Sequence, residues 1–226
     1  MQSSQDDIFA AFEADRWFER NRRALERIDP SKDFPLRLME LYGLRPRRVL
    51  EVGAANGYRL AFIHQNYGCK VVAVEPSLSA VRDGKVQFPE VAFVSALAHA
   101  IPLKESFDLI IVNNVFHWVD RAHLLRSVAE IDRLQEDGGF LIIGDFYPST
   151  LVRTRYHHLT DRVVYTYKQN YAATFLASGL YHEVGLVTGD HSSKAMRGDV
   201  EEMGRLSAWL LRKMLKEHYV EVSSDR

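Results

Sequence analysis

The feature that most constrains the fold is the stretch over residues 48–60, which reads Arg-Val-Leu-Glu-Val-Gly-Ala-Ala-Asn-Gly-Tyr-Arg-Leu. A short apolar run with β-branched residues meets a turn of small residues, and an amphipathic segment follows over residues 58–66. This order predicts a buried strand, a tight loop and the start of a helix. Gly53 and Gly57 lack a Cβ atom, so a ligand can approach the loop backbone, where the first N–H groups of the helix are free to bind it.

The spacing of small residues in this loop distinguishes between two classes of nucleotide-binding protein. The dinucleotide fingerprint G-x-G-x-x-G fails, because Tyr58 stands where its last glycine is needed. With the acid Glu51 two residues before Gly53, the segment instead resembles motif I of the class I (Rossmann-like) S-adenosylmethionine-dependent methyltransferases, usually [DE]-x-G-x-G-x-G. The middle glycine of that motif is Ala55 here, a departure that narrows the loop and leaves the backbone path open.

Length and composition set further bounds on the chain. Its 226 residues suit one domain, and 46% hydrophobic with 26% charged residues is ordinary for a globular enzyme. A net charge of −1 argues against non-specific binding to nucleic acid, and no apolar run is long enough for membrane insertion. A single cysteine, Cys69, excludes an internal disulfide. We therefore expect a cytoplasmic protein with no nucleic-acid partner and no membrane insertion.

Two helices are expected before the strand–loop–helix unit. Residues 1–7 are expected to be disordered, Asp6 or Asp7 caps a first helix that runs to about residue 28, and a second helix covers residues 31–42. In the family that the loop resembles, such helices often cover the cofactor. The alternative is that the aromatic side chains of the first helix, Trp17 and Phe18, merely pack on the core.

A second buried strand, over residues 70–77, carries the acid Glu75 near its end. In nucleotide-binding folds an acid about 20 residues beyond the glycine loop, at the end of the second strand, binds the ribose. A carboxylate suits this role because it accepts hydrogen bonds from both vicinal hydroxyl groups. The alternative is a solvated acid that caps the helix beginning near Ser77.

Two further segments resemble those of the same family. Residues 95–103 resemble the family segment D-A-x-x-L-P-F, which lies against the adenine, but Leu97 replaces its acid. That contact is therefore either lost or taken over by backbone groups near Ala98. Residues 106–119 resemble the segment S-F-D-x-V-x-x-x-x-x-x-H-x-V of small-molecule methyltransferases. Its histidine, His117, is a candidate general base, with a structural hydrogen-bonding role as the alternative.

The remaining pattern completes an α/β fold. A third strand over residues 91–94 and a fourth within residues 106–119 come first. A helix over residues 120–134 and a fifth strand over 140–146 continue an alternation that implies a parallel sheet with right-handed crossovers. Residues 181–188 alternate as a sixth strand. Residues 203–215 fit either a strand or a helix, and we interpret them as the family's antiparallel last strand, beside the fifth. The predicted fold is a Rossmann-like, seven-stranded, mostly parallel sheet with helices on both faces and extra N-terminal helices.

We expect a single methyltransferase-like domain over residues 1–226. It divides into an N-terminal helical cap (1–45), a cofactor-binding core (46–146), and an acceptor-side insertion with the last strands (147–226). The basic and aromatic mixture over residues 148–171 suits an anionic, hydroxylated or sugar-like acceptor. A solvated cover segment is an equal alternative.

The resemblance implies methyl transfer from S-adenosylmethionine, released as S-adenosylhomocysteine, to a small-molecule acceptor. We expect an oxygen acceptor on a metabolite, sugar or natural product, and a homodimer is left open. The alternative is a protein that binds S-adenosylmethionine or S-adenosylhomocysteine without methylating, as a partner subunit or sensor. A nicotinamide dehydrogenase is a third reading, which Tyr58 argues against.

The resemblance also assigns residues. His117 is the one catalytic candidate. No metal site is expected, because the adjacent His157 and His158 point apart and lack accompanying cysteine or carboxylate spacing. The cofactor-binding residues implied are Glu51, Gly53, Ala54, Ala55, Gly57, Glu75, Pro76, Ala96, Leu97, Ala98 and Asn113.

Overall fold

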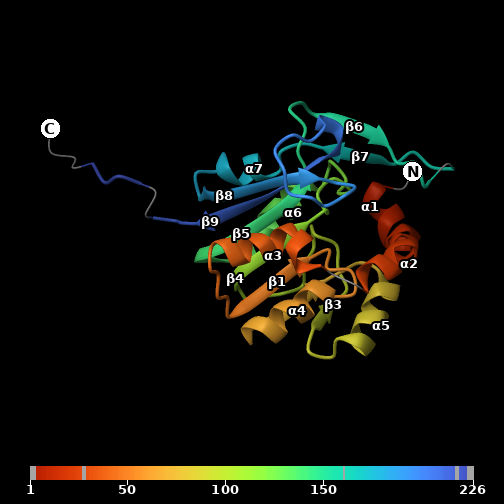
Figure 1. The fold of residues 1–226 in the computed structure, drawn as a ribbon, viewed down its shortest axis with the longest axis horizontal. Coiled ribbons are helices and arrows are strands. Elements are labelled where there is room, and N and C mark those ends of the chain that lie inside the picture. The colour runs from red at the N-terminus through yellow and green to blue at the C-terminus, as the bar shows by residue number, and fades with distance from the viewer. Residues whose placement is uncertain (1–3, 27–28, 160, 217–218, 223–226) are drawn as a thin grey trace.

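A central sheet organises the chain in the computed structural model, which describes residues 4–26, 29–159, 161–216 and 219–222 (Figure 1). Within these residues seven strands form the sheet, in the spatial order β3-β2-β1-β4-β5-β9-β8. Neighbouring strands are parallel from β3 through to β5, and β9 runs antiparallel to both of its neighbours. Their bounds are β1 Arg48–Val52, β2 Lys70–Val74, β3 Ala92–Val94, β4 Phe107–Asn113, β5 Gln135–Phe146, β8 Tyr181–Asp190 and β9 Arg205–Lys213.

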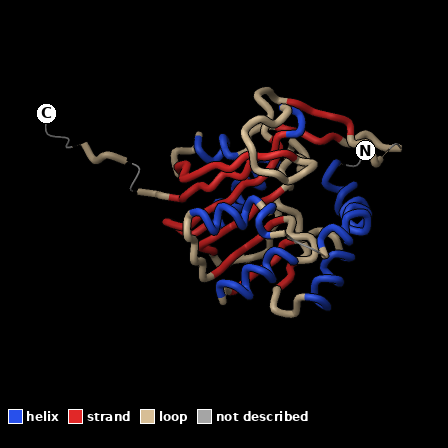
Figure 2. The backbone as a smooth tube through the Cα atoms, viewed as in Figure 1, coloured by secondary structure: helices blue, strands red, loops and turns tan. Residues whose placement is uncertain are grey.

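Helices surround this sheet, as the blue and red segments of Figure 2 show. Short 3₁₀ turns also occur at Pro30–Lys32 and Glu202–Gly204, and a separate two-stranded hairpin joins β6 (Val152–Arg155) to β7 (Tyr165–Lys168). The helices are α1 Gln5–Ile8, a π-helical turn Phe9–Glu13, α2 Ala14–Leu25, α3 Phe34–Leu41, α4 Tyr58–Tyr67, α5 Leu78–Gln87, α6 Leu124–Leu134 and α7 Ala172–Leu176. Among the described residues, no helix has the length and apolar character that a membrane crossing requires.

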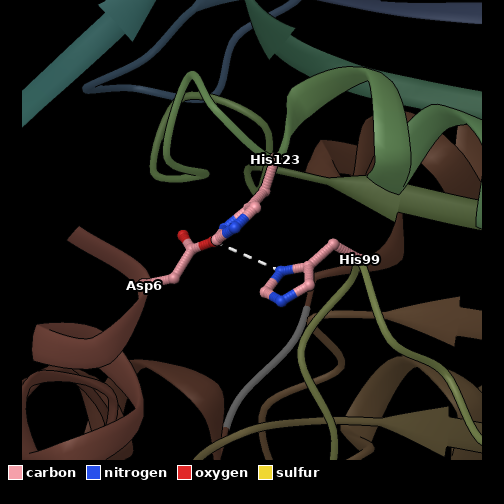
Figure 3. Close-up of side chains that lie close together, drawn as sticks. All are labelled: Asp6, His99 and His123. Atoms are coloured by element: carbon pink, nitrogen blue, oxygen red, sulfur yellow. Dashed lines mark hydrogen bonds and ion pairs between the residues drawn. The ribbon is translucent and has the colours of Figure 1, made fainter. Parts of the chain in front are cut away.

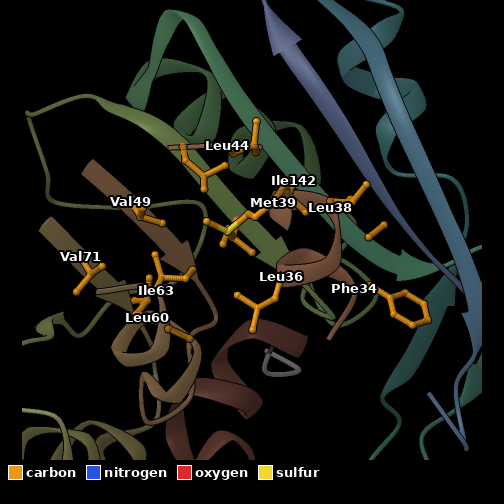
Figure 4. Close-up of a cluster of buried hydrophobic side chains, with 14 of the residues drawn as sticks. Phe34, Leu36, Leu38, Met39, Leu44, Val49, Leu60, Ile63, Val71 and Ile142 are labelled. Atoms are coloured by element: carbon orange, nitrogen blue, oxygen red, sulfur yellow. The ribbon is translucent and has the colours of Figure 1, made fainter. Parts of the chain in front are cut away.

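Successive strand residues face opposite sides of the sheet, so each face has its own core. Val49 packs with α3 and α4 in the cluster drawn in Figure 4, whereas its neighbour Leu50 packs with α6 and α7 on the other side. Both residues are fully buried, because helices cover both faces of the sheet. The near-continuous apolar strands of the sequence follow from this double burial.

The predicted fold class is confirmed, including the strand at residues 203–215. In β9, Leu206, Ala208 and Leu210 lie in one core and Trp209 and Leu211 in the other. A strand buried on both faces shows no alternation, which is why the sequence pattern was ambiguous there. Insertion of β9 beside β5 was also predicted and is seen in the antiparallel pairing of these two strands.

The first helix begins differently from the prediction. Ser4 caps α1, accepting a hydrogen bond from the Asp7 amide, and Asp7 accepts one from the Ser4 amide in return. Neither Asp6 nor Asp7 is therefore the cap. Gln5 and Asp6 are buried rather than disordered, because their side chains bind the core. Residues 1–3, also predicted to be disordered, lie outside the described residues.

Candidate functional site

A cavity of about 170 Å³ opens at the carboxyl ends of β1, β2 and β4. This is where ligands of open α/β sheets bind, because the loops that leave adjacent strands diverge there. The N-terminal helices cover the cavity on one side, contributing Phe9, Ala14, Trp17 and Leu25 to its lining. The cavity therefore lies between the sheet edge and a helical cover.

The loop after β1 forms the floor of the cavity. The Gly53 amide donates to the Val74 carbonyl (2.8 Å), which ties the loop to the end of β2. Gly53 has φ +73°, and a Cβ atom placed on it would lie 2.3 Å from Val115 Cγ2. Ala55 also lies in the left-handed region, with φ +49°. The backbone path of the glycine loop is thus kept despite the alanine, at the modest strain that a side chain brings in this region.

The carboxylate of Glu75 faces this loop and is buried, with 7% of the residue exposed. Its Oε2 accepts from the Ala55 amide (2.9 Å) and its Oε1 from the Ser77 amide (2.8 Å). Burial, as the largest effect, and the nearby acids Glu51 and Asp15 raise the pKa of Glu75 to about 7. The two backbone hydrogen bonds act in the opposite direction and reduce the shift. Glu75 has no cationic partner of its own in the part of the chain that the structure describes.

A second buried acid lies beside the loop. Glu51 accepts from Arg59 through Oε1, and Arg59 forms a bidentate pair with Asp33 at 2.8–3.0 Å. Burial raises the pKa of Glu51 although the Arg59 guanidinium opposes the shift. The other oxygen, Oε2, is buried and has no hydrogen-bond partner within the described residues. An orphaned carboxylate oxygen on a cavity wall is a group prepared for a ligand donor.

The opposite wall comes from the loop after β3 and the exit of β4. Ala96, Leu97 and Ala98 line the cavity there, together with Asn113 and Asn114. Leu97 places an apolar side chain on the wall at the position where the family pattern has an acid. This part of the wall is therefore apolar, with side-chain amides at its inner end.

Ten of the eleven residues predicted to bind the cofactor line this one cavity. Gly57 does not: it is the N-cap of α4 with φ +78°, and a Cβ atom there would meet Phe93 at 2.8 Å. In the structure Gly57 begins α4, at a place where the Phe93 side chain of β3 leaves no space for a Cβ atom. The ten lining residues are Glu51, Gly53, Ala54, Ala55, Glu75, Pro76, Ala96, Leu97, Ala98 and Asn113.

His117 lies outside the cavity lining. It is 4% exposed, and its Nδ1 is 2.8 Å from Asp145 Oδ1, while its amide donates to the other Asp145 oxygen. Phe146 and Trp118 pack against its ring. This geometry fits the alternative role considered for His117, a buried hydrogen bond between the exits of β4 and β5, and the catalytic role stays a prediction.

The sequence did not single out several residues of the site. Arg59 lies on α4 yet binds Asp33 of the segment before α3, and no local pattern reveals a pair between separate segments. Trp118 lines the cavity and is held edge-on by Tyr156 (4.3 Å between ring centroids). Trp17, by contrast, was named as a candidate cover residue and does line the cavity.

The predicted acceptor segment forms the β6–β7 hairpin. Its basic side chains stack on aromatic rings: Arg153 over Tyr165 (4.8 Å) and Lys168 over Phe146 (4.0 Å). None of these four residues lines the cavity. The hairpin instead supports the cover through Gln5, whose side chain donates to the Tyr165 carbonyl.

Known proteins share this core. Residues 50–143 match a family model described as a methyltransferase domain. An uncharacterized methyltransferase of Mycobacterium tuberculosis is 34% identical over 96 residues, which are 42% of this chain and 38% of that protein. A demethylmenaquinone methyltransferase of Renibacterium salmoninarum is 30% identical over 101 residues, 44% of this chain and 41% of that protein. The matches span about two fifths of these relatives. Over residues 50–143 the chain is thus similar to known methyltransferase domains.

Solved methyltransferases share the fold over most of the chain. A 1,6-didemethyltoxoflavin-N1-methyltransferase of Burkholderia thailandensis, crystallised with 1,6-didemethyltoxoflavin and S-adenosylhomocysteine, gives a TM-score of 0.65 at 18% identity, covering 93% of this chain and 87% of that one. An N-methyltransferase of Bradyrhizobium japonicum in complex with S-adenosylhomocysteine gives 0.57 at 16% identity, covering 84% and 97%. At such identities the likeness concerns the methyltransferase fold alone.

Proposed function

We propose that the chain is an S-adenosylmethionine-dependent methyltransferase that acts on a small molecule, with an oxygen atom of a metabolite, sugar or natural product as the acceptor. The observation that carries the proposal is the gathering of ten predicted cofactor residues on one cavity at the carboxyl edge of the sheet. We also propose the division into a cap (1–45), a core (46–146) and an acceptor-side part (147–226) within one domain.

The cavity has the features that this cofactor needs. The orphaned Glu51 Oε2 offers an acceptor for an ammonium group, and Gly53 lets the loop backbone pass close to Val115, where a Cβ atom would not fit. The buried Glu75 carboxylate offers acceptors for a ribose diol, and the apolar 96–98 segment offers a face for a purine ring. The residues present therefore fit S-adenosylmethionine, with S-adenosylhomocysteine as the product.

Acidic side chains on the wall match the charge of that ligand. Glu51 and Glu75 are both buried there. Within the described residues, Arg59 is the one cationic side chain that pairs with Glu51, so binding of a cationic ligand is favoured. When bound, S-adenosylmethionine supplies a methyl group activated by a sulfonium cation. The tasks left to the chain are to bind, to orient the acceptor and to exclude water.

The N-terminal cover adds aromatic side chains to the acceptor surface in this proposal. Phe9, Trp17 and Trp118 line the cavity on the cover side, and aromatic rings of this kind pack on sugar faces and planar rings. The similar proteins include a malonyl-[acyl-carrier protein] O-methyltransferase and N-methyltransferases. An acceptor panel must therefore contain hydroxyl and amine compounds, and we expect the hydroxyl compounds to react.

The test is transfer of a labelled methyl group from S-adenosylmethionine to such a panel, with binding measured in parallel. We expect a methylated hydroxyl compound and S-adenosylhomocysteine in equal amounts, and loss of binding by about 1–3 kcal/mol in Glu75→Ala, because hydrogen bonds to a charged group disappear. Binding without transfer to any compound would favour a partner subunit or sensor. Transfer to amines alone would reject the oxygen acceptor.

A further inference from the structure

Three side chains with metal-binding atoms converge beside the cavity. Asp6 comes from α1, His99 from the loop after β3, and His123 from the residue before α6 (Figure 3). His99 Nδ1 lies 3.2 Å from Asp6 Oδ2, and His123 Nδ1 lies 2.6 Å from the same oxygen. One ligand atom from each residue falls within 4.8 Å of the others. No local sequence spacing reveals this group, because its members come from separate segments.

We propose that Asp6, His99 and His123 form a binding site for one divalent transition-metal ion of the zinc class. Two imidazole nitrogens and one carboxylate oxygen are a donor set that first-row transition metals accept, and three protein ligands leave a further position open. Such an ion does not compete with the methyl donor for ligands, because Glu51, Glu75 and the Gly53 loop are not part of this group. The proposal does not depend on methyl transfer.

The two separations from Asp6 suit this chemistry once the stacked rings of His99 and His123 (4.1 Å between centroids) turn apart. Bonds of about 2.0–2.1 Å at tetrahedral angles place ligand atoms roughly 3.3 Å apart. The Asp6–His99 separation of 3.2 Å already meets this value, whereas His123 at 2.6 Å must move outward. The side chain of His123 is 31% exposed, so it can move without disturbing the core.

The carboxylate is positioned independently of any ion. Asp6 Oδ1 accepts from the Asp120 amide (2.8 Å), which leaves Oδ2 directed at the two histidines. Asp120 in turn accepts from the Gln5 amide (2.9 Å), so α1 and the segment before α6 hold each other. An outer hydrogen bond of this kind is the usual means of orienting a ligating carboxylate.

An ion at this position would join the helical cover to the core. Asp6 and His99 also line the cavity, while Asp6 belongs to the cover and the two histidines to the core. In binding, each ring offers Nδ1 to the ion and carries its hydrogen on Nε2, so neutral histidines need lose no proton. Occupancy would then stabilise the position that α1 takes against the core.

The experiment is a titration of the tag-free, chelator-treated full chain with Zn²⁺ by calorimetry and with Co²⁺ by visible absorption. We expect one equivalent to bind, with affinity falling on the order of tenfold or more in each of Asp6→Asn, His99→Gln and His123→Gln. Asp6→Asn keeps an acceptor for the Asp120 amide. His157→Gln, which removes an exposed histidine outside the group, serves as the matched control and should bind as the wild type does.

Circular dichroism checks that each variant folds. His123→Gln is the decisive variant, because the His123 side chain is partly exposed and its replacement should not disturb folding. The proposal is overturned if the wild-type chain takes up no ion saturably at up to millimolar metal. It is equally overturned if the folded His123→Gln and Asp6→Asn variants bind as tightly as the wild type, since the ion would then sit elsewhere. Neither result bears on S-adenosylmethionine binding, which is measured separately.

Discussion

Glu75 gives the site its pH dependence. Its pKa is raised from 4.5 to about 7 by burial, so the free chain holds this carboxyl protonated more readily than an unfolded chain does. The stability that Glu75 contributes is therefore present below pH 4.5 and is lost as the pH rises toward 7. A ligand that donates hydrogen bonds to the ionised carboxylate binds more tightly at higher pH, where Glu75 has lost its proton.

We accordingly predict that the affinity for S-adenosylmethionine increases as the pH rises from 6 to 8 and then levels off. The increase should approach tenfold per unit at its steepest, since one pKa unit corresponds to about 1.36 kcal/mol. Titrations at a series of pH values check this, and Glu75→Gln should give a shallower profile, in which only the part due to the raised pKa of Glu51 remains. An unchanged slope in Glu75→Gln would assign the dependence to another group.

Arg59 is the residue on which the buried acids of the site depend. It pairs with Asp33 and Glu51, and all three side chains are at most 9% exposed. Arg59→Met should lower the free energy of unfolding by about 3–5 kcal/mol, because both acids lose their counter-charge in a buried place. Urea denaturation measures this. Arg47→Met, which removes an exposed side chain that pairs with Asp108 and Glu136, should cost less than about 1 kcal/mol, and equal losses in the two variants would contradict this role of Arg59.

At the scale of elements, the loop between β1 and α4 was the most predictable part of the site. Its apolar strand, its small residues and the helix after it are adjacent in sequence, so local physics determines their arrangement. The cover is different. Asp15 on α2 accepts from the Ser77 hydroxyl (2.6 Å) and the Ser79 amide (3.0 Å) at the start of α5. Because these segments lie far apart in the sequence, the hydrophobic periodicity of neither segment indicates that they are in contact.

The close approach in this loop can be tested against a matched glycine. Gly53 and Gly68 both have positive φ, +73° and +65°, but only Gly53 has a neighbour, Val115, where a Cβ atom would stand. Gly68→Ala should cost only backbone strain of about 1–2 kcal/mol and leave S-adenosylmethionine binding unchanged. Gly53→Ala should cost more in urea denaturation and weaken binding by calorimetry, because Val115 must move. Equal behaviour of the two variants would argue against the loop as the floor of the ligand site.

At the scale of the whole molecule, the parallel sheet was predictable, because apolar strands alternate with helical segments and each crossover obeys the same handedness. The orientation of the His117 side chain was not predictable. Its segment leads directly to the strand edge where a ligand is expected, yet the ring turns to Asp145 at the neighbouring strand. Whether a side chain points into a cavity or into the core depends on which partner it meets in the folded chain, and sequence spacing does not record this.

Because the sheet edge, the glycine loop and the N-terminal cover all enclose one cavity, ligand binding should stabilise the chain as a unit. S-adenosylhomocysteine at a hundred times its Kd should add about 2.7 kcal/mol of stability. For a chain of this size that corresponds to a rise of roughly 5–10 °C in Tm. Thermal denaturation followed by circular dichroism measures this, with NAD at the same concentration as the control. A Tm unaffected by S-adenosylhomocysteine would mean that the cavity is not its site.

The most direct test is a calorimetric titration of the wild-type chain with S-adenosylmethionine, repeated in the presence of excess NADH. We predict saturable binding of one equivalent that NADH does not displace. No saturable heat with S-adenosylmethionine, or complete displacement by NADH, would contradict the assignment of the cavity between Gly53 and Glu75 to a methyl donor.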